Sequence, residues 1–100
     1  MVKCIQNASE IPQRGSVVID FFATWCGPCK RIAPAFENLA DKYYPTITFL
    51  KCDVDECQEL VDQFQISAMP TFVFLKDGKV LTTVEGADLK AMEQAFALLL

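Results

Sequence analysis

The sequence contains no histidine among its 100 residues, and this absence restricts the metal sites that the chain can form. A tetrahedral zinc site needs four nitrogen or sulfur ligands, so cysteine would have to supply them. The chain has five cysteines, which are Cys4, Cys26, Cys29, Cys52 and Cys57. We expect no bound metal, and a zinc site that joins Cys26 and Cys29 to two of the other cysteines is kept as an alternative.

Long apolar runs are also missing. The apolar runs of the chain are far shorter than the roughly 18–20 residues that span a bilayer, and residues 1–5 do not resemble the apolar part of a signal peptide. An odd number of cysteines argues against a fully paired, secreted framework and favours a reducing compartment. We therefore expect a soluble, cytoplasmic protein that does not associate with membranes.

An excess of basic charge is absent as well. The formal net charge is -4 and the charged residues are scattered, which disfavours binding to nucleic acid. The sequence has no internal repeat, linker or low-complexity segment, and 52% of its residues are hydrophobic, which is enough for one core. Residues 1–100 are therefore expected to form a single domain.

Periodic apolar residues predict strands that alternate with helices. Residues 16–22 are typical of a buried parallel strand, and residues 28–43 repeat apolar side chains at helical spacing, with Pro34 expected to kink the helix. Asp77-Gly78 is a strong hairpin signal. The other expected elements are strands at 2–5, 46–50, 71–76 and 79–84, a short helix within 7–14, a helix that Asp55 and Gln58 would cap, and a helix after Gly86. This order predicts an α/β fold, a central mixed sheet of about five strands flanked by about four helices.

The segment Trp25-Cys26-Gly27-Pro28-Cys29 joins the first long strand to the helix that follows it. Pro28 falls in the first helical turn, where proline is tolerated, so Cys26 is expected at the helix N-terminus. Unpaired N–H groups and the helix dipole favour a thiolate there, and a thiolate is the species that attacks disulfides. Cys29 is expected to be less exposed, with its Cα atom roughly 5–6 Å from that of Cys26, which suits a disulfide. The pair predicts a redox site, and a structural disulfide without catalysis is the other alternative.

Asp20 is a carboxylate in the middle of an apolar strand. Burying its charge would cost on the order of several kcal/mol, so we expect a raised pKa and a carboxyl that holds a proton near neutral pH. Such a group near a thiol pair suits general acid/base work, because it can take the proton of Cys29 when that thiol attacks a mixed disulfide. The alternative is a carboxylate that reaches water at the edge of the strand.

Three separated motifs make the chain resemble the thioredoxin family over essentially its whole length. They are residues 22–30 (FATWCGPCK), Lys51 with residues 53–55 (DVD), and residues 68–72 (AMPTF). The resemblance implies the thioredoxin fold and a general protein dithiol–disulfide oxidoreductase, in which Cys26 attacks a substrate disulfide and Cys29 resolves the mixed disulfide. It also implies that no prosthetic cofactor is needed, that an NADPH-dependent thioredoxin reductase donates electrons, and that disulfide-containing proteins are the clients.

The resemblance assigns further roles around the cysteines. It implies that Asp20 is the proton acceptor. It also favours an electrostatic effect of Lys51 on Asp20, and a solvated surface lysine is the alternative. Gly27 and Pro28 between the cysteines are similar to the reducing members of the family.

A substrate-binding surface is expected beside the cysteines. By resemblance the Met69-Pro70 bond is cis and faces the cysteines, with the adjacent backbone pairing a substrate peptide; a trans proline that only starts a strand is the alternative. Trp25, Gly86 and Ala87 are expected to form an apolar rim for the substrate. Core packing is the alternative for Trp25, and an ordinary turn is the alternative for Gly86.

Three further cysteines lie outside the redox turn. Cys57 lies on the apolar face of its expected helix and is either an inert core residue or a regulatory thiol. Cys4 and Cys52 alternate with core positions of strands and are expected to be structural. Family members that link as dimers carry a cysteine directly before the Met-Pro pair; Ala68 stands there in this chain, so a monomer is expected.

Two rival functions stay open. A disulfide oxidase or isomerase would differ from a reductase in the redox potential of the Cys26–Cys29 pair. A thioredoxin-like binding subunit, held in a complex for its surface alone, would perform its role without either cysteine.

Overall fold

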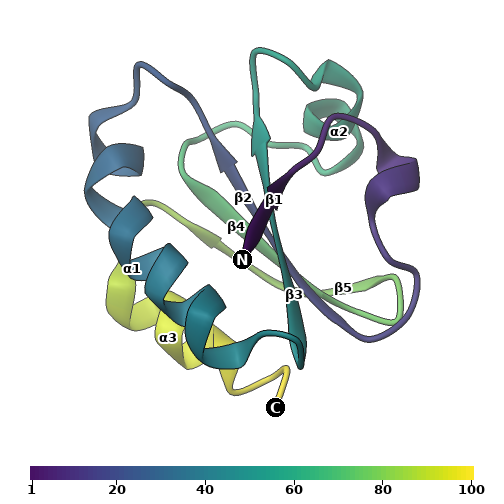
Figure 1. Cartoon of the computed structure of the whole chain (residues 1–100). Helices are drawn as coiled ribbons and strands as arrows, with labels where there is room; N and C mark the ends of the chain where they lie inside the picture. The colour runs from purple at the N-terminus through teal and green to yellow at the C-terminus, as the bar shows by residue number, and fades with distance from the viewer.

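Five strands form one mixed sheet in the computed structural model, which describes residues 1–100 (Figure 1). Their order across the sheet is β1-β3-β2-β4-β5. The strands β1, β3 and β2 run parallel, whereas β4 is antiparallel to β2 and β5 is antiparallel to β4. The bounds are β1 Val2–Cys4, β2 Ser16–Phe22, β3 Ile47–Asp53, β4 Thr71–Lys76 and β5 Lys79–Glu85.

Three α-helices cover the sheet, where about four were expected. They are α1 (Gly27–Tyr43), α2 (Gln58–Gln63) and α3 (Leu89–Phe96). The fourth is a single 3₁₀ turn, η1 (Ala8–Glu10), because Pro12 and Gly15, which has φ +84°, leave no room for a longer helix. None of the helices combines the length and the apolar character needed to cross a bilayer.

The helices divide between the two faces of the sheet. Helices α1 and α3 lie side by side on one face, and α2 lies on the other with the N-terminal turn (Figure 1). Each face has its own apolar core. The core under α1 and α3 is built largely from phenylalanine rings, and the core under α2 is mostly aliphatic and contains Cys52 and Cys57.

The central strand β2 supplies side chains to both cores. Val17, Ile19 and Phe21 point to the α2 face, and Val18 points to the α1 face. Side chains alternate along a strand, so Asp20 shares the α1 face with Val18. Burial on both faces explains why the strand reads as a nearly continuous apolar run that Asp20 interrupts.

The hairpin expected at Asp77-Gly78 is confirmed. Both residues have positive φ, 51° and 82°, as a two-residue type I′ turn requires, and they connect β4 directly to β5. The cis bond expected at Met69-Pro70 is also present, together with a second one at Tyr44-Pro45 that the sequence did not indicate. Pro34 lies inside α1 without ending it.

Parallel pairing places the carboxyl ends of β2 and β3 together. Phe22 lies opposite Asp53 in the sheet, and the N–H of Val54 donates to the carbonyl of Phe22 at 2.9 Å. From this edge β2 leads into α1 and β3 leads into α2. Two strand-to-helix junctions therefore meet at one edge of the sheet, where ligand sites of such folds usually lie.

Candidate active site

Cys26 and Cys29 form a disulfide across the first turn of α1. Their Cα atoms lie 5.3 Å apart, within the expected range. Cys26 is the N-cap residue of the helix, and its Sγ accepts a hydrogen bond from the backbone N–H of Cys29 at 3.2 Å. After reduction the same N–H favours negative charge on Cys26, so the local backbone prepares this sulfur to be a thiolate.

Cys29 is the less exposed of the two cysteines, as expected, but the difference is small. The exposed fraction is 6% for Cys26 and 4% for Cys29 in the disulfide form. Both are covered because Phe22, Val54 and Met69 pack against the cluster that the two cysteines form with Ala23. The asymmetry of the pair therefore lies in its hydrogen bonds rather than in its exposure.

Trp25 lies on the surface beside the disulfide. Its side chain is 66% exposed, so core packing is wrong for this residue. Its Nε1 donates to Oδ2 of Asp55 at 3.0 Å. The helix-capping pattern predicts Asp55 as a cap, but Cys57 is the N-cap of α2 and makes no side-chain cap bond. Asp55 therefore binds the side chain of Trp25, whereas the sequence pattern predicted only a helix cap.

The Met69-Pro70 segment closes the other side of the disulfide. The carbonyl oxygen of Met69 lies 3.7 Å from Sγ of Cys26. Pro70 is hydrogen-bonded to the loop between β5 and α3, because its carbonyl accepts from the N–H of Gly86 at 2.7 Å. Gly86 has φ +92°, a conformation that favours glycine, and the neighbouring Ala87 is exposed and borders α1. Gly86 is therefore linked through Pro70 to the segment that faces Cys26.

Asp20 is buried behind the disulfide, as its position in the strand predicted. It is 6% exposed, and its Oδ1 has no hydrogen-bond partner. Burial raises the pKa of the Asp20 carboxyl from an ordinary 3.8 to about 7, Lys51 opposes the rise, and Glu37 adds to it. A carboxyl with this pKa exchanges protons readily at neutral pH.

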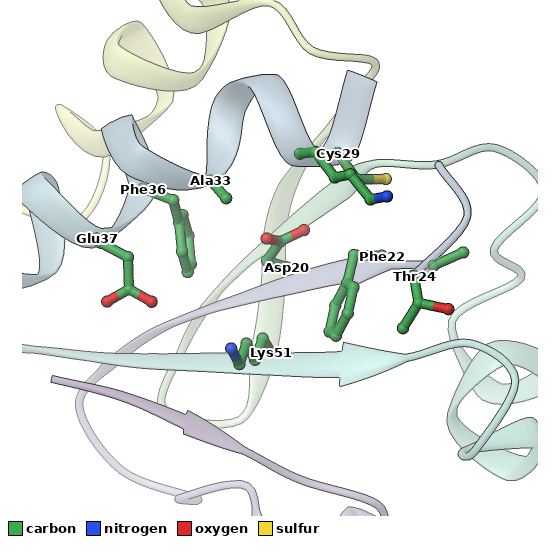
Figure 2. A pocket seen from close by; sticks show the side chains of 10 residues that line it. Asp20, Phe22, Thr24, Cys29, Ala33, Phe36, Glu37 and Lys51 are labelled. Carbon is green, nitrogen blue, oxygen red and sulfur yellow. The ribbon is translucent and has the colours of Figure 1, made fainter. Parts of the chain in front are cut away.

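A cavity of about 280 Å³ connects Asp20 with the redox pair. Figure 2 shows the Asp20 carboxyl between α1, which carries Cys29 and Ala33, and the strand that carries Lys51. The cavity has room for water, which can carry a proton between groups that do not touch. Its lining residues are Asp20, Phe22, Ala23, Thr24, Cys29, Lys30, Ala33, Phe36, Glu37 and Lys51.

Lys51 and Glu37 both line this cavity and shift the pKa of Asp20 in opposite directions. Lys51 lies within β3 directly opposite Asp20 in the sheet, and its Nζ is 5.7 Å from the centre of the Phe22 ring. The positive charge of Lys51 lowers the pKa of Asp20, which is the direction expected of a tuning residue. Glu37 was missed, although Cys29, Ala33 and Glu37 follow one another at intervals of four, which places them on one face of a helix.

The remaining cysteines differ from one another. Cys52 and Cys57 form a second disulfide, and their exposed fractions are 0% and 3%. Burial of Cys52 and Cys57 agrees with the sequence, but their pairing was not predicted. Cys4 is exposed and unpaired, so the expectation that it is structural is wrong, because β1 is an edge strand. No three His, Cys, Asp or Glu side chains are grouped closely enough to hold a metal ion.

Comparison with known proteins gives the same family over nearly the whole chain. The family model described as thioredoxin matches residues 4–97. Thioredoxin-2 of Saccharomyces cerevisiae is 51% identical over 102 aligned positions, which cover 97% of this chain and 97% of that protein. Thioredoxin H1 of Arabidopsis thaliana is 46% identical and covers 93% of this chain and 79% of its own length.

The fold is also found in solved structures. The crystal structure of oxidized mitochondrial thioredoxin 3 from Saccharomyces cerevisiae superposes with a TM-score of 0.90 at 40% sequence identity. The match covers 98% of this chain and 95% of that one. Sequence and backbone therefore agree on one assignment.

Proposed function

Because this chain belongs to the thioredoxin family and is a general dithiol–disulfide oxidoreductase, we propose specific roles for its residues in the reduction of protein disulfides. The observation that carries the proposal is the Cys26–Cys29 disulfide at the start of α1, with the N–H of Cys29 on Sγ of Cys26 and a buried carboxyl in the adjoining cavity. These three features supply a nucleophile, a resolving thiol and a proton acceptor.

Cys26 attacks first in this proposal. Its thiolate forms a bond to one sulfur of the client disulfide, and the other client sulfur leaves as a thiolate. The N–H of Cys29 and the positive end of α1 stabilise the attacking anion. The result is a mixed disulfide between Cys26 and the client.

Cys29 then resolves the mixed disulfide. Its thiol loses a proton to the Asp20 carboxylate through the cavity that both residues line. The Cys29 thiolate attacks Sγ of Cys26, the client sulfur leaves, and the Cys26–Cys29 disulfide forms. Two electrons have then passed to the client. Lys51 and Glu37 are positioning residues, because they act on the pKa of Asp20 in opposite directions.

The client lies on the surface around the disulfide. In this proposal Trp25 supplies an exposed apolar face, and the client backbone lies along Met69 and Pro70, which lead on to Gly86 and Ala87. An extended client segment can add backbone hydrogen bonds there, as in strand addition. Recognition through backbone and a few apolar contacts suits a general reductase.

We further propose that an NADPH-dependent thioredoxin reductase restores the dithiol, that disulfide-containing proteins are the clients, and that the chain acts as a monomer in the cytoplasm. The exposed, unpaired Cys4 supports a reducing compartment, since a free surface thiol is readily oxidised elsewhere.

The test combines NADPH, a thioredoxin reductase, this protein and a client protein that contains disulfides. We expect NADPH oxidation to depend on the protein and to stop in Cys26→Ser and Cys29→Ser variants. Oxidation of NADPH without thiols appearing in the client protein would contradict the client step. A pair potential far more oxidising than about −270 mV, the value typical of a thioredoxin, would instead favour an oxidase or isomerase.

A further inference from the structure

The buried pair Cys52–Cys57 spans the junction between β3 and α2. Cys52 lies in the last part of β3, and Cys57 is the N-cap of α2. Their Cα atoms are 6.6 Å apart, inside the range that a disulfide can bridge. The two sulfurs therefore close a short loop, 52–57, at the same edge of the sheet as the active-site turn.

The surroundings of the two sulfurs also suit the reduced pair, once the S–S bond is broken and the sulfurs move apart to van der Waals distance. Sγ of Cys57 lies 3.0 Å from the carbonyl oxygen of Asp53, so a Cys57 thiol has an acceptor for its proton. Cys52 lies in an apolar core, where a neutral thiol needs no partner. A pair that fits its surroundings in both oxidation states can change between them without unfolding the domain.

A chain of hydrogen bonds leads from this pair to the active-site surface. The carbonyl of Asp53 that faces Cys57 also accepts from the N–H of Glu56 at 2.8 Å, and Oδ1 of Asp53 accepts from the N–H of Asp55 at 3.0 Å. Asp55 in turn accepts from Nε1 of Trp25 at 3.0 Å. Oxidation of Cys57 removes the proton donor at the beginning of this chain.

We propose that Cys52 and Cys57 are a second redox pair, which hydroperoxides oxidise. The oxidation state of this pair controls the conformation of the loop 52–57 and, through Asp55, the position of the Trp25 side chain beside the active site. The formation of this pair does not depend on the function proposed above. Its consequence is regulatory, since Trp25 belongs to the proposed client surface.

The chemistry needs only a peroxide and the two thiols. The sulfur of Cys57 attacks the peroxide, the O–O bond breaks, and Cys57 becomes a sulfenic acid while the peroxide leaves as an alcohol or water. The sulfur of Cys52 then attacks the sulfur of Cys57, the S–O bond breaks, and water leaves with the proton of Cys52. An added dithiol returns both electrons and restores the two thiols.

Access to the buried sulfurs comes from opening of α2. This helix has only six residues and no side-chain cap at its first turn, so its N-terminal end opens at low cost in free energy. We place the first oxidation at Cys57 because it lies between the exposed residues Glu56 and Gln58, whereas Cys52 is fully buried in β3.

The test uses the Cys26→Ser/Cys29→Ser variant, in which only Cys4, Cys52 and Cys57 remain. After hydrogen peroxide, we expect a loss of two alkylatable thiols, a mass lower by two hydrogens, and a peptide that joins Cys52 to Cys57, all reversed by dithiothreitol. The matched control adds Cys52→Val and should form no intramolecular disulfide. Persistence of all three thiols, or stable sulfinic acid at Cys57 in place of a disulfide, would overturn the proposal.

Coupling to the active site is measured in the same variant. Trp25 is the only tryptophan, so its fluorescence reports this position alone. We expect the emission to change on oxidation and to return with dithiothreitol, and we expect Asp55→Ala to abolish that response while the disulfide still forms. An emission that stays constant while the disulfide forms would show that the pair does not control Trp25.

Discussion

The two cysteine pairs occupy equivalent places in the topology and differ in their surroundings. Each pair lies where a parallel strand passes into a helix, Cys26–Cys29 after β2 and Cys52–Cys57 across the end of β3, and all four cysteines are buried. The first pair borders an exposed tryptophan, a carbonyl and a cavity that contains Asp20. The second pair is enclosed by an aliphatic core.

This difference shows what makes a thiol pair catalytic. Burial is similar in the two pairs, so burial does not decide the matter. A reductase needs a surface that receives the client and a group that takes the proton of the resolving thiol, and the residues that we propose for both roles lie beside the first pair. The second pair has instead a hydrogen-bond path that ends at the client surface, which suits regulation.

The largest expected effect separates the two pairs by their reaction with clients. Cys26→Ser should lower turnover by on the order of 10³-fold or more, because the nucleophile is lost. Cys29→Ser should also stop turnover but should trap clients as mixed disulfides, visible on non-reducing gels. Cys52→Val should keep nearly full turnover in reducing buffer. Efficient trapping by Cys26→Ser would reverse the assigned order of attack.

The next effect concerns the buried carboxyl that only the first pair possesses. Since folding raises the pKa of Asp20 from 3.8 to about 7, the native state binds the extra proton, and stability is lost as pH rises from about 3.8 through about 7. Asp20→Ala should therefore stabilise the oxidised protein at pH 8 by on the order of 1–4 kcal/mol, less the cost of the cavity it leaves.

Denaturant titrations at pH 8 and pH 4 measure this effect. At pH 4 the benefit should nearly vanish, because wild-type Asp20 is protonated there in the native state. Asp20→Asn is the matched variant that keeps the volume, and both variants should slow turnover by on the order of 10²-fold at pH 7. A variant less stable than the wild type at pH 8 would show that Asp20 is well solvated or paired.

A smaller effect tests the electrostatic balance at the cavity. Lys51 holds the pKa of Asp20 down, so Lys51→Met should raise it further above about 7, whereas Glu37→Gln should lower it. Carboxyl carbon chemical shifts of Asp20, followed through a pH titration, measure both changes. Lys76→Met, at an exposed position in β4, is the control and should leave the titration unchanged. Shifts in the same direction for Lys51→Met and Glu37→Gln would contradict the assigned causes.

The smallest effect concerns the thiol of the second pair. In reducing buffer Cys57→Ser keeps a donor for the Asp53 carbonyl, whereas Cys57→Ala does not. The serine variant should therefore be more stable than the alanine variant by about 0.5–1.5 kcal/mol, measured by denaturant unfolding with dithiothreitol present. Equal stabilities would remove the hydrogen bond from the proposed path to Trp25.

The features that the sequence predicted correctly share a local origin. The helix that begins at the CGPC turn follows from Pro28 in its first turn, and the hairpin follows from Asp77-Gly78, which accepts positive φ. The raised pKa of Asp20 was predictable because an apolar strand with neighbours on both sides buries whatever side chain it carries.

The features that the sequence missed arise where distant segments meet. Asp55 matched a helix-capping pattern, but its carboxylate accepts a hydrogen bond from the side chain of Trp25 instead. The pairing of Cys52 with Cys57 depends on the direction in which β3 enters α2, and the similar burial of Cys26 and Cys29 depends on Val54 and Met69 from other loops. The contacts of Asp55, Val54 and Met69 have no signal within one segment, and the Cys52–Cys57 pair, although its residues are only five positions apart, is set by the path of the chain between strand and helix.

By itself the sequence determined the order of the elements, the redox turn and the buried acid behind it, because periodicity, turn chemistry and burial act over a few neighbouring residues. Only the tertiary structure decided which groups tune that acid, how far the two catalytic sulfurs differ, and that a second cysteine pair is linked to Trp25. Those properties depend on distances between Lys51, Glu37, Asp55 and the cysteines, and such distances are set when the sheet brings separate strand ends to one edge.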